Sequence, residues 1–281
     1  MSSYGAVLVG RNDNYGENLC ERTTYSINSM ISELDSVIYI DWNTEDGKPS
    51  LIEEISDDLI NSGKFIWTKI SSELAKELIP DDPEVQAVCE VLARNIGIRK
   101  LNTDFIISTN IDIVCPDRNL IEVENNSLKM YTAGKRNIPM EVMRTLGDRQ
   151  FPKIYKNNLK ELESKYGQQP VVSVCDGDIF SLVSGCGDWQ LAHKDIWYSI
   201  KGFEERLYKR MRADTNIHRK AYIFGYEIGV DWKLPVWHIN HGGGSGGWGG
   251  ENDIQLSVFM EETTNKDTWG FSDLQLDWNI L

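Results

Sequence analysis

The first 114 residues alternate between short apolar runs and longer amphipathic segments, and this alternation restricts the possible folds. Runs at 4–10, 36–41, 65–70 and 101–114 are typical of buried strands. Between them, apolar residues at three-to-four spacing predict helices over 19–34, 49–63 and 82–96. This β-α-β-α-β-α-β order predicts an α/β fold, in which a parallel sheet has helices on both faces.

The fourth predicted strand ends in polar residues. Its apolar run, Phe105 to Ile107, is followed by Asn110, Ile111 and Asp112. Binding sites of parallel sheets lie at the carboxyl ends of the strands. If the backbone stays extended, Asn110 and Asp112 point the same way and offer oxygen ligands suited to Mg²⁺ or Mn²⁺. A strand-end turn without function is the competing interpretation.

Charge and cysteine content exclude several classes of partner. The 281 residues carry a net charge of −14, which opposes binding to nucleic acid or to an anionic membrane. A nucleoside diphosphate would meet the same repulsion unless a divalent cation and local Arg or Lys side chains reversed it. The five cysteines include no Cys-x-x-Cys pair, so we expect reduced thiols and no structural zinc.

Other motifs are missing from the sequence. No segment approaches the roughly 18 to 20 apolar residues of a membrane span, and the first residues do not resemble a signal peptide. We therefore expect a cytoplasmic protein without a membrane anchor. The sequence lacks both Gly-x-Gly-x-x-Gly and Gly-x-x-x-x-Gly-Lys-Ser/Thr, which argues against dinucleotide enzymes and P-loop NTPases.

Four local features of the amino-terminal half agree in order and spacing with GT-A glycosyltransferases. The triplet Asn110 to Asp112 resembles their Asp-X-Asp signature, and Arg94-Asn95-Ile-Gly resembles their Arg-Asn-x-Gly helix motif. The polar end of the first strand and the acidic end of the second also match. The resemblance implies nucleotide-sugar binding by Arg11, Asn12, Asp13, Asp41, Arg94, Asn95, Asn110, Ile111 and Asp112.

A second resemblance to the same family lies between Gly185 and Glu205. A Gly-Asp turn at Gly187 and Asp188 precedes a short strand and an apolar helix that ends in Trp-x-x-x-x-Gly-Phe-x-Glu. The resemblance implies contact with donor or acceptor sugar by Gly187, Asp188 and Trp189. Gly187 would let the backbone approach a ligand, and Asp188 would offer a carboxylate to sugar hydroxyls.

The family has an acidic residue at the start of a later helix, and Asp214 stands at that place. The commoner Glu-Asp pair is Ala213-Asp214 in this sequence. A catalytic base must reach the acceptor hydroxyl with a suitable pKa. Asp214 is our first candidate and Asp188 the second, while Glu205 or a later acid remains open. A helix-capping or solvated acid is the competing interpretation of Asp214.

Two of the four histidines, His238 and His241, stand just before a glycine-rich loop. A histidine here is similar to the third metal ligand of several GT-A families, so Asp112, His241 and Asn110 are predicted to hold Mn²⁺ or Mg²⁺. In an extended segment the two histidines would face opposite ways. We therefore expect His241 alone to bind and His238 to be buried and hydrogen-bonded.

The glycine-rich segment 242–250 has two interpretations. It is either a surface loop without function or a lid that closes over bound nucleotide-sugar, with Trp248 stacked on a sugar. Trp248 to Asp253 also resembles an acceptor-binding stretch of galactosyltransferases, but it follows the histidine instead of preceding it. Glu251 and Asp253 are reserve candidates for the acid.

Together these features predict one mixed, mainly parallel GT-A domain over 1–281, with a smaller acceptor-side subregion. The nucleotide-sugar half would be 1–118, and the acceptor half 119–281. The implied activity is metal-dependent, inverting transfer from a nucleoside-diphosphate sugar, with UDP favoured, to a hydroxyl of a glycan or other acceptor. A sugar nucleotidyltransferase, a non-catalytic carbohydrate-binding protein and an inactive transferase remain alternatives. The sequence determines neither the donor sugar, nor the acceptor, nor the oligomeric state.

Overall fold

The computed structural model describes residues 2–79, 89–121, 128–146, 161, 164–165, 187–207, 213–241 and 265–281. The strands are β1 (Tyr4–Gly10), β2 (Ser36–Trp42), β3 (Phe65–Ile70), β4 (Phe105–Thr109), β5 (Ile113–Val114), β6 (Lys129–Ile138), β7 (Trp189–His193), β8 (Glu227–Ile239) and β9 (Asn279–Ile280). The α-helices are α1 (Leu19–Glu33), α2 (Leu51–Ile55), α3 (Ser72–Leu78), α4 (Glu90–Lys100), α5 (Met140–Leu146), α8 (Lys194–Ser199) and α9 (Ala213–Ile223). Short 3-10 turns are η1 (Ser56–Asp58), η2 (Arg118–Leu120) and η3 (Trp269–Phe271).

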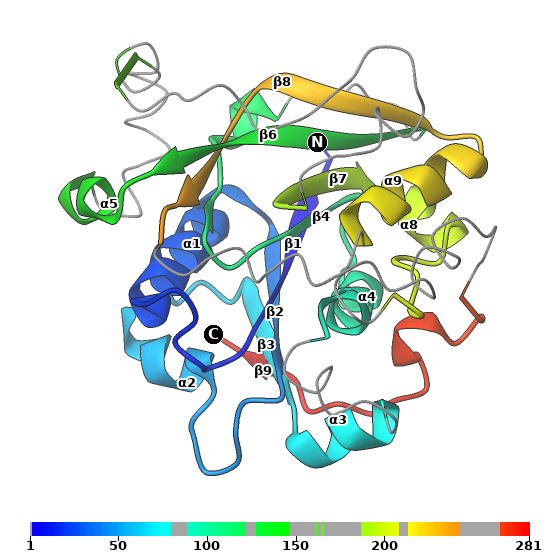
Figure 1. The fold of residues 1–281 in the computed structure, drawn as a ribbon, viewed down its shortest axis with the longest axis horizontal. Helices are drawn as coiled ribbons and strands as arrows, with labels where there is room; N and C mark the ends of the chain where they lie inside the picture. The colour runs from blue at the N-terminus through cyan, green and yellow to red at the C-terminus, as the bar shows by residue number, and fades with distance from the viewer. Residues whose placement is uncertain are drawn as a thin grey trace, which may run out of the picture.

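These strands form one mixed sheet in the order β5-β8-β6-β7-β4-β1-β2-β3-β9. Strands β4, β1, β2 and β3 are parallel. Strand β7 runs antiparallel to β4 and to β6, whereas the long strands β6 and β8 are parallel to each other and lie side by side (Figure 1). The sheet confirms the predicted α/β fold class.

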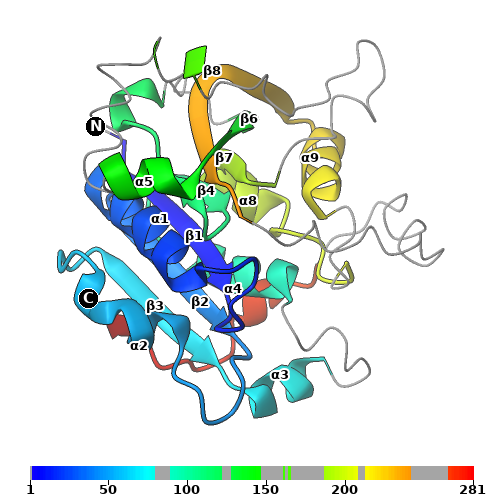
Figure 2. The same ribbon diagram turned by 60° about the vertical axis from the view of Figure 1, so that its left-hand side comes forward.

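Helices cover both faces of the parallel part of the sheet (Figures 1 and 2). Successive residues of β1 face opposite ways, so Val7 joins the core beneath α4, α8 and α9, whereas Leu8 joins the core beneath α1 and α2. A smaller cluster lies between α5 and the ends of β5 and β8. Each face therefore has its own apolar core, as expected for strands buried on both sides.

Local signals explain where several elements begin. The Ser50 side chain accepts a hydrogen bond from the Glu53 backbone amide, and the Glu53 carboxylate accepts one from the Ser50 amide. This capping box starts α2. Helix α3 was not predicted, although Ser71 caps its first turn. The predicted helix 82–96 is found from Glu90 onward as α4, and residues 80–88 lie outside the described ranges.

The predicted strand 101–114 is corrected in the structure, where it is shorter and broken. Strand β4 ends at Thr109, and β5 resumes only at Ile113 after a turn. Strand β5 then leaves β4 and pairs with β8, matching Ile113 to His238. This break places a turn, and not a continuous strand, at the centre of the candidate site.

The carboxyl-terminal segment returns to the edge of the amino-terminal half. Strand β9 pairs antiparallel with β3, and the Thr68 hydroxyl donates to the Asp277 carbonyl. The carboxyl-terminal tail therefore packs back on the sheet. Within the described ranges, no helix has the length and apolar character needed to cross a membrane.

Candidate functional site

The turn after β4 sends Asn110 and Asp112 in different directions. Asn110 hydrogen-bonds to Arg94 and Asp188, whereas Asp112 lies against Arg22 and two histidines. The expectation that both side chains point the same way required an extended backbone, and the turn removes that condition. The two residues therefore take part in separate groups.

Asp112 is the centre of the first group. Only 7% of the residue is exposed. Its Oδ2 lies 3.0 Å from Arg22 Nη1, and 3.5 Å and 3.2 Å from the Nε2 atoms of His238 and His241. The aspartate and histidine ligand atoms all lie within 4.8 Å of one another, close enough for one metal ion.

Both histidines reach Asp112, so the expectation that they face opposite ways is wrong. Strand β8 ends at Ile239, whose amide donates to the Asp112 carbonyl, and the next residue bonds to Ile138 at the end of β6. His241 therefore lies beyond the strand, where the alternation of side chains no longer applies. The two imidazole rings lie 5.1 Å apart between centroids.

A hydrogen bond orients the imidazole of His238. Its Nδ1 lies 3.0 Å from Asn137 Oδ1. A carbonyl oxygen only accepts, so Nδ1 donates to it and Nε2 is the ring atom that faces Asp112. Metal-binding histidines have this arrangement, in which a second residue fixes the ring. A lone pair facing a carboxylate is stabilised only by a cation shared between them, either a proton or a metal ion.

Two buried atoms of this group, Asp112 Oδ1 and His241 Nδ1, have no hydrogen-bond partner among the residues that the structure describes. Burial alone would raise the pKa of Asp112. Hydrogen bonds from His238 and His241, together with the charges of His238 and Arg22, instead hold that pKa well below its usual range. One carboxylate and two imidazoles are a donor set that fits a divalent transition metal such as Mn²⁺.

Sequence reasoning missed Arg22, although a signal was present. Arg22 lies on the buried stripe of α1, between Leu19 and Ile27, and is 1% exposed. Its guanidinium donates to Asp112, to the Glu17 carbonyl at 3.1 Å and to the Tyr15 carbonyl. A charged residue on an apolar stripe requires such partners. That requirement could have indicated a buried carboxylate opposite α1.

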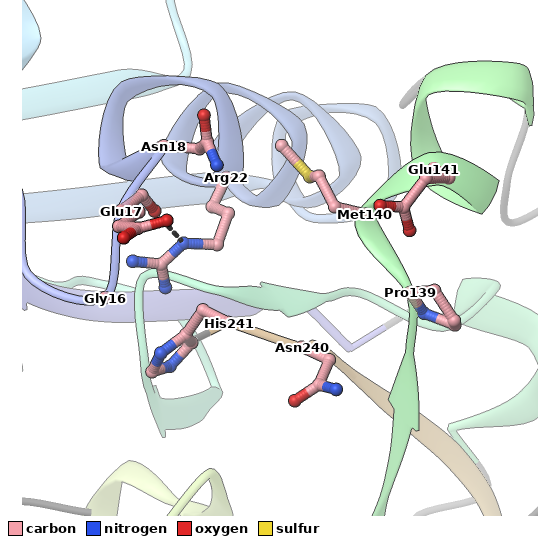
Figure 3. A pocket seen from close by; sticks show the side chains of 9 residues that line it. All are labelled: Gly16, Glu17, Asn18, Arg22, Pro139, Met140, Glu141, Asn240 and His241. Carbon is pink, nitrogen blue, oxygen red and sulfur yellow. Dashed lines mark hydrogen bonds between the residues drawn. The ribbon is translucent and has the colours of Figure 1, made fainter. Parts of the chain in front are cut away.

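A pocket of about 370 Å³ adjoins the metal-binding group (Figure 3). Arg22 and His241 belong to both the pocket and the group. Gly16 lines the pocket with φ of +69°, and a Cβ there would lie 2.3 Å from His241 Nδ1. Glycine is therefore required for the close approach of His241. The remaining lining residues are Glu17, Asn18, Pro139, Met140, Glu141 and Asn240.

The second group surrounds Asp188, which is 4% exposed. Arg94 donates from Nη2 to Asn110 Oδ1 at 2.6 Å, and Asn110 Nδ2 donates to Asp188 Oδ1. The Thr109 hydroxyl donates to the Asp188 carbonyl at 2.6 Å. Arg94 and Asp188 therefore occupy both amide atoms of Asn110. The predicted contact of Asn110 with a metal ion stays a prediction, and these hydrogen bonds do not favour it.

The two candidate bases lie near each other. Asp214 stands in the first turn of α9, and a Cβ on Gly187 would lie 2.2 Å from Asp214 Oδ1. Because Gly187 has no side chain, the backbone immediately before Asp188 can approach the Asp214 carboxylate. Trp189, predicted to contact sugar, is fully buried in the core of β7.

The residues predicted to bind nucleotide lie at the ends of β1 and β2. The Asn12 amide donates to the Thr44 hydroxyl at 3.0 Å, and Asp13 accepts from the Tyr15 amide at 3.0 Å. Asp41 is fully buried and accepts from Thr44 and from the Leu51 amide at 3.2 Å. Arg11 is half-buried beside them. Their contact with a nucleotide stays a prediction.

Two further residues predicted to bind nucleotide, Asn95 and Ile111, instead make contacts within the fold. Asn95 is fully buried and exchanges hydrogen bonds with the Phe203 backbone at 2.8 Å and 2.9 Å, which ties α4 to the segment after α8. Ile111 packs against the core formed by α1 and α2. The predicted lid 242–250 with Trp248, and the reserve acids Glu251 and Asp253, lie outside the described residues.

No protein-family model matches the sequence, and no curated protein matches it significantly. Two solved structures are similar in fold. The mannosyltransferase PcManGT from Pyrobaculum calidifontis, solved with GDP-Man and Mn²⁺, has a TM-score of 0.51 and 12% identity over 84% of this chain and 56% of that chain. GalNAc-T7, solved with UDP, GalNAc and Mn²⁺, has a TM-score of 0.55 and 11% identity over 86% of this chain and 44% of that chain.

The chain thus spans about half the length of these two structures. At such low identity the likeness shows the fold alone. Together with the mixed sheet and its helices on both faces, it confirms the predicted fold. The chain has the GT-A fold of these glycosyltransferases.

Proposed function

We propose that this protein is a glycosyltransferase that moves a sugar from a nucleoside-diphosphate donor to an acceptor hydroxyl and depends on a divalent cation. The observation that carries this proposal is the group formed at the carboxyl end of β4 by buried Asp112 and half-buried His238 and His241. In a GT-A fold, this edge of the sheet is where a ligand would lie. UDP is the first nucleotide to test, as the sequence resemblance favours it.

Asp112, His238 and His241 would hold the cation. Imidazole ligands favour Mn²⁺ over Mg²⁺, which prefers an all-oxygen environment. Bound there, the cation would neutralise the diphosphate leaving group. Arg22 adds a second positive charge at Asp112, and with a net charge of −14 this local concentration of positive charge is what an anionic donor requires.

We assign the transfer chemistry to the second group. Asp214 would take the proton of the acceptor hydroxyl as its oxygen attacks C1 of the sugar, and the bond from C1 to the diphosphate oxygen would break with its electron pair. Asp188 would accept hydrogen bonds from the sugar hydroxyls. In a single displacement of this kind the configuration at C1 is inverted. We retain the division into a nucleotide-sugar half, 1–118, and an acceptor half, 119–281.

Asp214→Asn tests this assignment. The amide cannot take a proton, so transfer should fall by about 10² to 10⁴-fold while donor binding stays nearly intact. Both are measurable by product formation and by calorimetry with the nucleoside diphosphate. Full activity in this variant would contradict the role of Asp214.

The proposed function itself is tested by thermal unfolding with UDP, GDP, CMP or dTDP, each with and without Mn²⁺. A ligand at a hundred times its dissociation constant adds about 2.7 kcal/mol to the stability. We expect one nucleoside diphosphate to raise the midpoint only when Mn²⁺ is present. Asp267→Asn, which breaks an exposed ion pair with Lys201, is the control and should respond like wild type.

A different result would favour another class. If no nucleotide shifts the midpoint with or without Mn²⁺, the transferase proposal fails. A screen of free oligosaccharides by the same method would then test the non-catalytic carbohydrate-binding alternative. A shift by nucleoside triphosphate alone would instead favour a nucleotidyltransferase.

A further inference from the structure

We propose that Asn110 is a positioning residue that orients Asp188, and that it is not a ligand of the metal ion. This inference rests on the proposed function, because Asp188 is assigned there to the sugar. Asn110 stands where the sequence resemblance would place the first aspartate of a metal-binding signature. The structure offers a physical reason for an amide at that position.

The chemistry of its neighbours fixes the orientation of the Asn110 amide. An arginine only donates hydrogen bonds, so the amide oxygen must face Arg94, where Nη2 lies 2.6 Å away. The amide nitrogen then faces Asp188 and donates to its Oδ1. Reversing the amide would place donor against donor and acceptor against acceptor. Asparagine thus links a cation to a carboxylate with both bonds made correctly.

Arg94, the first residue in the series of hydrogen bonds from Arg94 to Asn110 to Asp188, is itself held in place. It lies on α4, is 4% exposed and donates from Nη1 to the Ser108 hydroxyl at 2.5 Å. Its guanidinium also lies 5.8 Å from the centre of the Phe203 ring. A buried, hydrogen-bonded arginine can therefore fix the amide of Asn110 in one rotamer.

Asp188 is held at two points from the end of β4. Its carboxylate accepts from Asn110, and its backbone carbonyl accepts from the Thr109 hydroxyl at 2.6 Å. Neighbouring residues of β4 and of the following turn thus position the aspartate that immediately precedes β7. An aspartate in place of Asn110 would face the Asp188 carboxylate with a second carboxylate and could not donate to it.

The metal-binding group is separate from this chain of contacts. Asp112 turns away from Asn110 and faces Arg22, His238 and His241. The amide oxygen that would have to bind a cation is already engaged with the Arg94 guanidinium. The turn at Ile111 therefore separates Asn110, which positions Asp188, from Asp112, which belongs to the metal-binding group.

The first test measures binding of Mn²⁺ alone by calorimetry. We expect Asn110→Ala to bind Mn²⁺ within about twofold of wild type, whereas Asp112→Ala should lose at least tenfold in affinity. If Asn110→Ala weakens Mn²⁺ binding as much as Asp112→Ala does, Asn110 is a ligand and the proposal is overturned. Absence of Mn²⁺ binding in wild type would contradict the proposed function instead.

The second test exchanges the two side chains and does not depend on activity. Asn110→Asp alone should lower the unfolding midpoint by roughly 4 °C or more, because two carboxylates then face each other. The double variant Asn110→Asp with Asp188→Asn again places an amide opposite a carboxylate, so we expect most of the midpoint to return. If the double variant loses as much stability as the two single variants lose together, the proposed link between Asn110 and Asp188 is contradicted.

The third readout separates positioning from folding. Asn110→Ala should lower kcat by at least tenfold with little change in the affinity for the nucleoside diphosphate, since the nucleotide site is untouched while Asp188 is misaligned. Asn119→Ala, which removes a comparable side-chain hydrogen bond in η2, is the matched control and should change neither value. A rise in KM without loss of kcat would place Asn110 in donor binding.

Discussion

Asp41 and Asp112 are both buried aspartates near the carboxyl ends of β2 and β4, the parallel strands on either side of β1, yet their surroundings differ. Asp41 accepts hydrogen bonds from the Thr44 hydroxyl and amide and from the Leu51 amide, and burial is the largest cause of its raised pKa. Asp112 faces Arg22 and two histidines, which lower its pKa against the effect of burial. Within the described part of the chain, its Oδ1 has no hydrogen-bond partner.

The difference indicates which carboxylate is built for a ligand. The hydrogen bonds of Asp41 come from the loop that follows it, and they tie the ends of β1 and β2 to the start of α2. Asp112 instead concentrates positively charged and metal-binding side chains from two distant segments of the chain, α1 and the end of β8. A carboxylate of this kind would favour binding of a cation, whereas Asp41 stabilises the local structure.

The largest effect on stability is expected at Arg22. Its guanidinium compensates the buried charge of Asp112, so Arg22→Met should lower the free energy of unfolding by about 3–5 kcal/mol. Denaturant titration measures this loss. Mn²⁺ should recover part of it, because a bound cation would replace the missing charge.

The matched control for Arg22 is Arg144→Met, which breaks an exposed ion pair with Glu21 on the same helix. This change should leave stability close to that of wild type. If Arg22→Met is equally mild and Mn²⁺ has no added effect, the charge of Asp112 does not need compensation and the contrast with Asp41 is lost.

The next effect concerns the residue that orients His238. Asn137→Ala removes the partner of Nδ1 and should weaken Mn²⁺ binding by about 10- to 100-fold without unfolding the protein. Calorimetry with Mn²⁺ measures the affinity, and circular dichroism checks the fold. Unchanged affinity would show that His238 does not bind the metal ion and would leave His241 as the histidine ligand, as first predicted from the sequence.

A smaller effect is expected in the loop around Asp41. Ser50→Ala removes the cap of α2 beside Leu51, so it should lower stability by about 1 kcal/mol. Mn²⁺ affinity should not change. Ser71→Ala at the cap of α3 provides the comparison. If Ser50→Ala loses Mn²⁺ binding and Ser71→Ala does not, the loop around Asp41 is connected to the metal-binding group. The distinction between Asp41 and Asp112 would then fail.

The smallest effect is a difference in pH dependence. Because its pKa is raised in the folded state, Asp41 favours folding most below its unfolded pKa of about 3.9, and this contribution is lost as pH rises through the folded value. The stability of wild type relative to Asp41→Asn should therefore increase as pH falls from 7 towards 4. A difference that decreases over this range would contradict the raised pKa.

Much of the fold could be predicted because it depends on local patterns. The apolar runs of β1 and β3 and the three-to-four spacing of α1 are properties of neighbouring residues, and the structure agrees with them. Helix α3 was missed because it has only seven residues, Ser72–Leu78, too few to show a clear period.

The site was predicted less completely because its contacts are distant in sequence. Arg22 and Asp112 are 90 residues apart, and the pairing of β5 with β8 brings His238 to the same place. The turn after Thr109 also reversed the expected relation of Asn110 and Asp112. Residue type indicated which side chains could act, but only the tertiary structure shows which of them meet.

The central claim is that Asp112, His238 and His241 hold a divalent cation that binds the donor. The most direct test is calorimetric titration of Mn²⁺ into wild type and into Asp112→Asn, followed in each case by UDP. We predict one Mn²⁺ per chain in wild type, UDP binding only after Mn²⁺, and loss of both in Asp112→Asn. UDP binding of equal affinity in both proteins without Mn²⁺ would contradict the claim.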